Sequence, residues 1–325
     1  MHTRKDENDR PPPRDFRQEV TNDIIRLLEE GHAPWQKPWK DGQSGRMPYN
    51  PTTGKAYRGG NVLALMISGM RKGYCDPRWM TYKQAADAGW QVRKGEKGTQ
   101  IEFWEVKPGA KDEDAEGDEE KRSRLIHRVY TVFNAQQIDA IPPVAIEPRR
   151  PFEVIEAGEK IMAGSGATIR HGGNRAYYTR AGDYIQLPEK DQFIDGPAYY
   201  ATGCHELIHW TGNENRLNRD TLTKSRGYNP QDEHYAREEL VAEIGSMMLA
   251  AETGIPHDPE QHAAYVASWL QALKKDKNEI FRAASAASKA TDYVLNVNRN
   301  VETPRMEESH AASVNGSRGP LRRAR

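Results

Sequence analysis

The clearest chemistry in this chain lies in one short run, His205-Glu206-Leu-Ile-His209. If the run is helical, the two histidines stand four residues apart and project from one face, so that both imidazoles reach one metal ion. Glu206 then lies beside the open coordination position of that ion. The spacing therefore predicts a metal-dependent hydrolase that cleaves peptide bonds.

Zinc is the expected ion, because neutral imidazole suits it and catalytic zinc sites take three protein ligands and leave the fourth position to water. Bound water becomes acidic enough to act as a nucleophile near neutral pH. Glu206 is expected to take the proton as general base and to pass it later to the leaving group. Besides His205 and His209, a third protein ligand must follow.

The candidates for the third ligand lie downstream, in a run of helical composition between Tyr235 and Leu249. Glu239 and Glu243 share one face of this helix, beside apolar positions that would pack inward. Acid groups next to an apolar surface need a partner. On this pattern Glu238, Glu239 and Glu243 all remain candidates, and an ordinary charged stripe on the helix is the alternative.

Composition limits the class of protein. The chain has 325 residues with 36% hydrophobic and 29% charged content, which allows two domains and is too polar for a membrane protein. Its formal net charge is zero, so any nucleic-acid binding must come from local patches. No apolar run approaches membrane-spanning length and the start lacks the apolar core of a signal peptide, which predicts a cytoplasmic protein.

The first half reads as a small mixed α/β unit at residues 15–140, after a charged and Pro-rich stretch at 1–14 that is expected to be disordered. Apolar periodicity predicts helices, and β-branched and aromatic content predicts strands. The expected helices begin at Asp15, Asn61 and Thr81, and the expected strands cover 90–93, 99–106 and 124–133. An acidic run at 107–120 reads as the long loop of a hairpin.

Two segments of this half, 33–40 and 49–61, interleave aromatic rings with cations and are rich in Pro and Gly. Such interleaving suits single-stranded nucleic acid, because bases stack on rings while cations meet phosphates. The alternative is that the rings pack the loops onto the core. The candidate DNA contacts are Trp35, Lys37, Trp39, Tyr49, Lys55, Tyr57, Arg58 and Asn61.

The second half follows a Pro-rich linker at 141–151 and spans 152–297, before a basic tail at 298–325 that is expected to be disordered. A helix and short strands are expected before the His205–His209 helix. A polar loop at 216–232 follows, which is placed to cover the cleft. Tyr235 begins the second helix and is expected to point outward.

The run Glu238-Glu239-Leu-Val-Ala-Glu243-Ile-Gly resembles the second active-site helix of gluzincin metallopeptidases. In that family a Glu ligates zinc and an acid one turn later holds a ligand histidine. The resemblance implies that Glu239 is the third ligand. It also implies that Glu243 accepts an imidazole N–H, which fixes the tautomer of the ring and raises its basicity.

A second resemblance covers residues from about 15 to 300. The motifs that carry it are Ala33-Pro-Trp-Gln-Lys-Pro-Trp39, Tyr49-Asn-Pro51, Tyr57-Arg-Gly-Gly-Asn61, Trp79-Met-Thr-Tyr82, Lys94-Gly-Glu-Lys-Gly98 and Val132-Phe-Asn-Ala-Gln-Gln137. They resemble the single-stranded DNA-binding domain of the ArdC antirestriction family, whose members join it to a zincin-like metallopeptidase domain. The resemblance implies an α+β fold and favours DNA contact by the loop aromatics.

The functional hypothesis is that the protein coats single-stranded DNA entering by conjugation or infection, shields it from host restriction and degrades proteins bound to it. The joined modules are similar in outline to Spartan-type proteases. One alternative is a non-catalytic coating protein with a structural metal site. Another is a primase-associated role, because plasmid primases of the TraC type carry a similar N-terminal domain.

Overall fold

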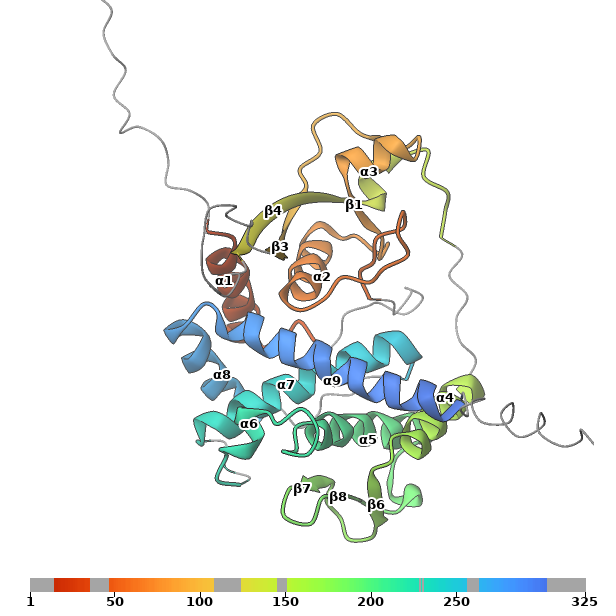
Figure 1. Cartoon of the computed structure of the whole chain (residues 1–325), viewed down its shortest axis with the longest axis vertical. Helices are drawn as coiled ribbons and strands as arrows, with labels where there is room; N and C mark the ends of the chain where they lie inside the picture. Colours follow the sequence, from red (N-terminus) through yellow and green to blue (C-terminus); the bar gives the residue numbers. More distant parts are fainter. Residues whose placement is uncertain are drawn as a thin grey trace, which may run out of the picture.

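The structure of the protein is a computed structural model (Figure 1). It describes residues 15–35, 47–107, 124–144, 151–227, 229, 231–255 and 263–302. The stretch 1–14, most of the basic tail and most of the Pro-rich linker, all singled out from the sequence, lie outside these ranges.

The N-terminal part combines short helices with small antiparallel sheets. Its helices are α1 (Phe16–Glu29), α2 (Gly60–Lys72) and α3 (Tyr82–Asp87), and its strands are β1 (Trp79–Thr81), β2 (Gln91–Val92), β3 (Thr99–Lys107), β4 (Arg124–Asn134) and β5 (Ile138–Asp139). One sheet has the order β1-β4-β3 and the other pairs β2 with β5. The helix starts follow local capping, since Asp15 caps α1 and Thr81 forms a capping box with Gln84 on α3.

The longest strands, β3 and β4, form the expected hairpin. They pair antiparallel from Thr99 opposite Val132 to Lys107 opposite Arg124. Ile101 and Val132 bury the base of this ribbon against α2 and Trp79. The acidic run between the two strands lies outside the described residues.

The C-terminal part is mainly helical, with one three-stranded sheet. Its helices are α4 (Pro151–Gly164), α5 (Gly196–Thr211), α6 (Asp220–Thr223), α7 (Glu233–Thr253), α8 (Ala263–Lys275) and α9 (Glu279–Glu302), and its strands are β6 (Thr168–His171), β7 (Tyr177–Thr179) and β8 (Tyr184–Leu187). The sheet order is β6-β8-β7, with β7 antiparallel to β8 at one edge. The α+β class expected from the sequence is confirmed.

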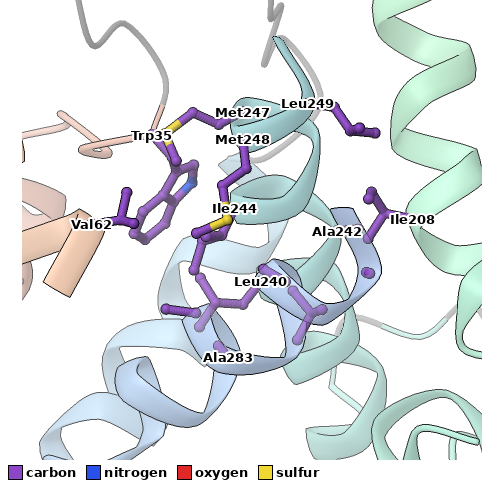
Figure 2. Close-up of a cluster of buried hydrophobic side chains, with 14 of the residues drawn as sticks. Trp35, Val62, Ile208, Leu240, Ala242, Ile244, Met247, Met248, Leu249 and Ala283 are labelled. Atoms are coloured by element: carbon purple, nitrogen blue, oxygen red, sulfur yellow. The ribbon is translucent and has the colours of Figure 1, made fainter. Parts of the chain in front are cut away.

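Helix α7 lies at the centre of the largest core cluster, between α5 and α9 (Figure 1). Figure 2 shows side chains of α7, such as Ile244 and Met247, packed between Ile208 of α5 and the pair Trp35 and Val62 from the N-terminal part. The largest hydrophobic cluster therefore includes residues from both sides of the Pro-rich linker, and two smaller clusters lie within the N-terminal part.

Within the described ranges, none of the helices has the length and apolar character that crossing a membrane requires.

Candidate metal centre

Helix α5 carries the two histidines and Glu206, and local contacts fix its first turn. The Asp195 side chain accepts a hydrogen bond from the Ala198 N–H at 2.8 Å, and Pro197 occupies the first turn. Most of the helix is buried, with Glu206 and His209 only 7% and 6% exposed. Burial restricts the rotamers of these side chains, which holds them in one arrangement.

Helix α7 brings three glutamates to α5 from the other side. Its first turn is capped by Asp232, which accepts from the His234 and Tyr235 N–H groups. Glu238, Glu239 and Glu243 are 0%, 4% and 0% exposed. Three carboxylates buried this completely require positive partners, because isolated buried charge is very costly.

The three sequence-predicted ligands converge on one point. One donor atom from each of His205, His209 and Glu239 lies within 4.8 Å of the other two. The two Nε2 atoms are 3.1 Å apart, and each lies 3.5 Å from a Glu239 carboxylate oxygen. Two tetrahedral ligands at about 2.0–2.1 Å from a zinc ion stand roughly 3.3 Å apart. The spacing therefore fits one small divalent cation.

The other ring nitrogen of each histidine faces its own carboxylate. His205 Nδ1 lies 3.0 Å from a Glu243 oxygen, and His209 Nδ1 lies 3.2 Å from a Glu238 oxygen. A carboxylate only accepts, so each Nδ1 carries the proton and each neutral ring directs its Nε2 lone pair inward. Glu243 thus occupies the place that the gluzincin resemblance implied, and Glu238 makes the equivalent contact to the other ring.

The buried carboxylates of the cluster favour a positive charge on or between the two histidines. Burial lowers the pKa of His205, yet the nearby carboxylates of Glu239 and Glu243 outweigh it and raise that pKa well above its ordinary value. For His209, burial is likewise outweighed, chiefly by Glu239, and the pKa rises to about 9. Without a metal ion, the raised pKa values keep both imidazoles protonated near neutral pH, and these protons balance the carboxylate charge. The donor set therefore fits a divalent metal ion, which supplies the charge that the carboxylates attract.

Glu206 lies in a different environment from the other glutamates. Burial raises the pKa of its carboxyl above the ordinary value, although the two histidines oppose the shift. The Tyr178 backbone N–H of β7 donates to the same carboxylate. A buried carboxyl with a raised pKa is suited to accept and return a proton near neutral pH.

Glu238 belongs to a buried network that sequence reasoning did not find. Its oxygens accept from Arg219 at 2.5 and 3.1 Å and from the Thr221 hydroxyl at 2.5 Å. Burial raises the pKa of Glu238, but Arg219 and His209 bring it down to about 2. Arg219 also donates to the Ile208 carbonyl oxygen at 2.6 Å, near the end of α5. Two residues of the polar loop expected at 216–232, Arg219 and Thr221, therefore hold Glu238 in place rather than cover the cleft.

Two tyrosines lie beside the third ligand. The expectation that Tyr235 points outward was wrong, because its side chain is buried at 7% exposure and hydrogen-bonds to Glu239. Its ring centroid is 5.8 Å from that of Tyr265 on α8. Burial, followed by the charge of Glu239, raises the pKa of both phenols. The site thus has two neutral hydroxyl donors close to its anionic ligand.

The prediction of Trp35 as a DNA contact is corrected by its position. Its ring is 0% exposed and packs edge-on against Trp269, with ring centroids 5.7 Å apart. Figure 2 places it beside Val62 and α7. A ring enclosed on all sides cannot stack on a base. The burial of Trp35 instead stabilises the packing of the N-terminal part against the C-terminal part of the chain.

Three further residues of this prediction make contacts within the chain. Tyr57 donates from its hydroxyl to the Trp79 carbonyl oxygen at 2.9 Å, Arg58 forms an ion pair with Asp292 of α9, and Asn61 exchanges two hydrogen bonds with the Glu102 backbone. Whether they also touch DNA stays a prediction.

Of the remaining candidate DNA contacts, two lie among the described residues and two lie outside them. Tyr49 is half-buried and Lys55 is exposed, so both stay predictions. Lys37 and Trp39 lie outside the described residues.

Comparison with known families matches each part of the chain separately. Residues 14–133 match the N-terminal domain of anti-restriction factor ArdC. Residues 156–286 match a zincin-like metallopeptidase family, whose fold implies a divalent metal. The two matches follow the order expected from the sequence.

Solved structures match both parts together. The metal-free crystal structure of antirestriction ArdC protein from the R388 plasmid is 40% identical, with a TM-score of 0.73, and the match covers 88% of this chain and 99% of that one. The Mn(II)-bound structure of the same protein has the same identity and coverage, with a TM-score of 0.70.

Curated relatives include two Escherichia coli proteins named DNA primase TraC, which are 50% and 46% identical over 86% and 90% of this chain. The chain spans only 27% and 20% of their lengths. An uncharacterised Sinorhizobium fredii protein, y4eC, is 39% identical over 88% of this chain and 94% of its own length. Because the identity to ArdC is 40% and nearly all of that protein is covered, this chain belongs to the ArdC antirestriction family.

Proposed function

We propose that this protein binds single-stranded DNA through its N-terminal part and cleaves proteins with a zinc-dependent peptidase site in its C-terminal part. Its role is to protect incoming plasmid or phage DNA from host restriction. The observation that carries the peptidase proposal is the convergence of His205, His209 and Glu239 beside the buried carboxyl of Glu206.

In this proposal His205 Nε2, His209 Nε2 and a Glu239 oxygen hold the zinc ion. When bound, zinc supplies Lewis acidity and a water molecule of lowered pKa. Glu243 and Glu238 keep the protons of the two imidazoles on Nδ1 and so keep both Nε2 lone pairs directed at the metal position.

Glu206 does the proton chemistry. Its carboxylate takes a proton from the attacking water and later donates it to the amide nitrogen of the departing peptide half. The hydrogen bond from the Tyr178 N–H orients the carboxylate, and the raised pKa of Glu206 brings it closer to neutral pH. Tyr265 is half-buried next to Tyr235, where a phenol is placed to donate to an oxyanion.

Strand β7 is the proposed binding edge for the substrate backbone. It lies at the edge of the β6-β8-β7 sheet, and the N–H of its central residue Tyr178 reaches Glu206. An extended peptide added along this edge would pass directly beside the general base. The site requires backbone contacts rather than a particular side chain, which suits varied protein substrates.

The DNA-binding proposal covers residues 15–140, with the peptidase part at 152–297 and the linker between them. It is supported by the match to the ArdC N-terminal domain and by exposed cations such as Lys55. Proteins attached to the same DNA are the proposed substrates, so that cleavage depends on single strands.

The experiment that tests the peptidase proposal is a proteolysis assay on the protein itself and on a DNA-bound partner. Each is incubated with and without single-stranded DNA and zinc. The wild type should cleave, and Glu206→Gln should lose activity by about a hundredfold or more while it keeps its metal, because only the proton transfer is removed. Glu214→Gln, which changes an exposed carboxylate just after α5, is the matched control and should cleave normally.

Equal cleavage by wild type and Glu206→Gln would refute the assignment of the general base. If neither variant cleaves while both bind metal and DNA, the protein acts by coating DNA and its metal site is structural. Comparing zinc with manganese in the same assay tests the choice of metal, since the related R388 protein has been crystallised with Mn(II).

A further inference from the structure

Three exposed aromatic side chains of the N-terminal part lie on the β3–β4 ribbon. Phe103, Trp104 and Tyr130 are 53%, 47% and 38% exposed, and Leu125 and Val129 are 58% and 45% exposed. Water-exposed rings in this number on one ribbon are not needed for folding, because they bury little apolar surface. Exposed apolar patches of this kind mark interaction surfaces.

The register assigns these rings to the two faces of the ribbon. Phe103 is opposite Arg128, and Tyr130 is opposite Ile101, so Phe103, Arg128 and Tyr130 lie on one face. We call these three residues the open face. The rings of Phe103 and Tyr130 meet edge-on, with centroids 6.3 Å apart. At its other end the same face is buried through Ile101, which anchors the open face to the core.

The opposite face of the ribbon carries Trp104 together with the exposed Leu125 and Val129, and the Trp104 ring is already in contact with neighbouring side chains. The Trp104 ring stacks on His127 at 4.3 Å between centroids, and the Arg17 guanidinium lies 5.7 Å from its centroid. Arg17 also pairs with Glu102 at 2.7 Å. The Trp104 ring therefore already has a stacking partner in His127, whereas the Phe103 and Tyr130 rings meet each other edge-on.

Charge identifies the kind of ligand that the open face fits. Arg128 is 47% exposed, and its ion pair with Glu105 is loose at 3.8 Å and also exposed. The guanidinium also contacts the Tyr130 side chain, and because exposed pairs of this kind contribute little to stability, another anion can compete for Arg128. Rings for stacking beside cations for phosphates are the two features that single-stranded nucleic acid requires.

We propose that the open face is the surface on which single-stranded DNA binds, with bases stacked on Phe103 and Tyr130 and a phosphate held by Arg128. The proposal rests on the DNA-binding part of the proposed function and places that binding on residues outside the two loops selected from the sequence. Duplex DNA should bind more weakly, because its bases are already stacked on one another.

The test is the affinity of the full-length protein for a fluorescently labelled oligothymidylate, measured by anisotropy at several salt concentrations. Phe103→Ala and Tyr130→Ala should each weaken binding roughly five- to hundredfold, as expected for loss of one base-stacking ring. Arg128→Ala should weaken binding and reduce the salt dependence by about one phosphate contact. Tyr82→Ala is the matched control, since Tyr82 is an equally exposed ring at 53% on α3, and it should bind like the wild type.

Conservative variants show whether weaker DNA binding comes from the loss of base stacking or from a loss of folded protein. Phe103→Leu keeps an apolar side chain without a ring and should bind weakly, while Tyr130→Phe keeps the ring and should bind nearly as well as the wild type. Thermal unfolding confirms that each variant is folded, because these side chains contribute little to the core.

The results distinguish failure of this surface from failure of the DNA-binding proposal. If the wild type binds and the open-face variants bind equally well, the surface assignment is wrong and DNA binding stands. If the wild type does not bind the oligonucleotide even at low salt, both the surface assignment and the DNA-binding proposal are wrong. If Phe103→Ala abolishes self-association, measured by sedimentation, but leaves DNA affinity unchanged, the face is an interface between copies and the proposal is wrong.

Discussion

At the residue scale, the centre is built from three glutamates of one helix with three different environments. Glu239 faces both Nε2 atoms, Glu243 faces one Nδ1 and Glu238 faces the other. Each imidazole is therefore fixed from both sides of its ring. This arrangement defines tautomer and orientation before any metal binds, which reduces the entropy that ordering the ligands would cost.

Glu238→Gln should weaken metal binding by about ten- to hundredfold, because the amide cannot hold the His209 proton on Nδ1 as a carboxylate does. Competition against a chromogenic chelator measures the affinity. Glu214→Gln is again the control and should bind metal normally. An unchanged affinity in Glu238→Gln would mean that packing of α5 alone orients His209.

Removing the metal should destabilise the fold. A chelator removes the cation that the buried carboxylates attract, and a ligand at a thousandfold excess over its Kd contributes about 4 kcal/mol to the free energy of unfolding. Thermal unfolding with and without chelator measures the loss, which added zinc should reverse. His205→Ala should show no response to either, and an equal response in this variant would argue that the metal binds elsewhere.

At the scale of elements, the distance between α5 and α7 decides whether these groups meet. Gly245 of α7 faces Ile208 of α5, and a Cβ there would lie 2.9–3.0 Å from side-chain atoms of Ile208. Ile208 comes directly before His209 in the sequence, and Gly245 is two residues after Glu243. The glycine therefore allows the close helix contact that brings carboxylates within reach of imidazoles.

Gly245→Ala should reduce the free energy of unfolding by about 1–3 kcal/mol, because the added methyl group overpacks a fully buried contact. It should also weaken metal binding, since any outward shift of α7 moves Glu239 and Glu243. Denaturant unfolding and metal competition measure the two effects. Adding Ile208→Val to Gly245→Ala should recover part of both, and a lack of recovery would place the strain elsewhere.

At the scale of the whole molecule, the two parts of the chain share a core. Trp35 is enclosed by α2, α7 and Trp269, and the Trp269 indole donates to the Ala236 carbonyl oxygen at 2.8 Å. The motif Tyr57-Arg-Gly-Gly-Asn61 also joins the parts, since Gly59 donates from its N–H to the Ser288 hydroxyl at 3.0 Å. The N-terminal and C-terminal parts are therefore held in a fixed relation.

Trp35→Ala should lower the free energy of unfolding by about 3–5 kcal/mol, because a large buried ring is lost from the packing between the two parts of the chain. Trp35→Phe should cost much less, since the indole N–H has no hydrogen-bond partner among the described residues. Denaturant unfolding followed by circular dichroism and by fluorescence should give one coincident transition for the wild type. Two separate transitions would contradict a shared core.

The sequence by itself determined what depends on local order along the chain. The i,i+4 spacing of His205 and His209 and the shared face of Glu239 and Glu243 follow from helix geometry, which fixes neighbours over one or two turns. Capping residues and strand patterns located α1, α3 and the β3–β4 hairpin for the same reason. Capping and periodicity are properties of short segments.

Only the tertiary structure decided which groups from distant segments meet. It assigned Glu238 to His209 and Arg219, enclosed Trp35 and left Phe103 and Tyr130 open to water. In the sequence, Trp35 and Phe103 are both aromatic residues within two positions of a charged side chain, and nothing local predicts which of them is buried. Burial depends on what packs against a residue, and those partners, such as Trp269 for Trp35, lie hundreds of residues away in the chain.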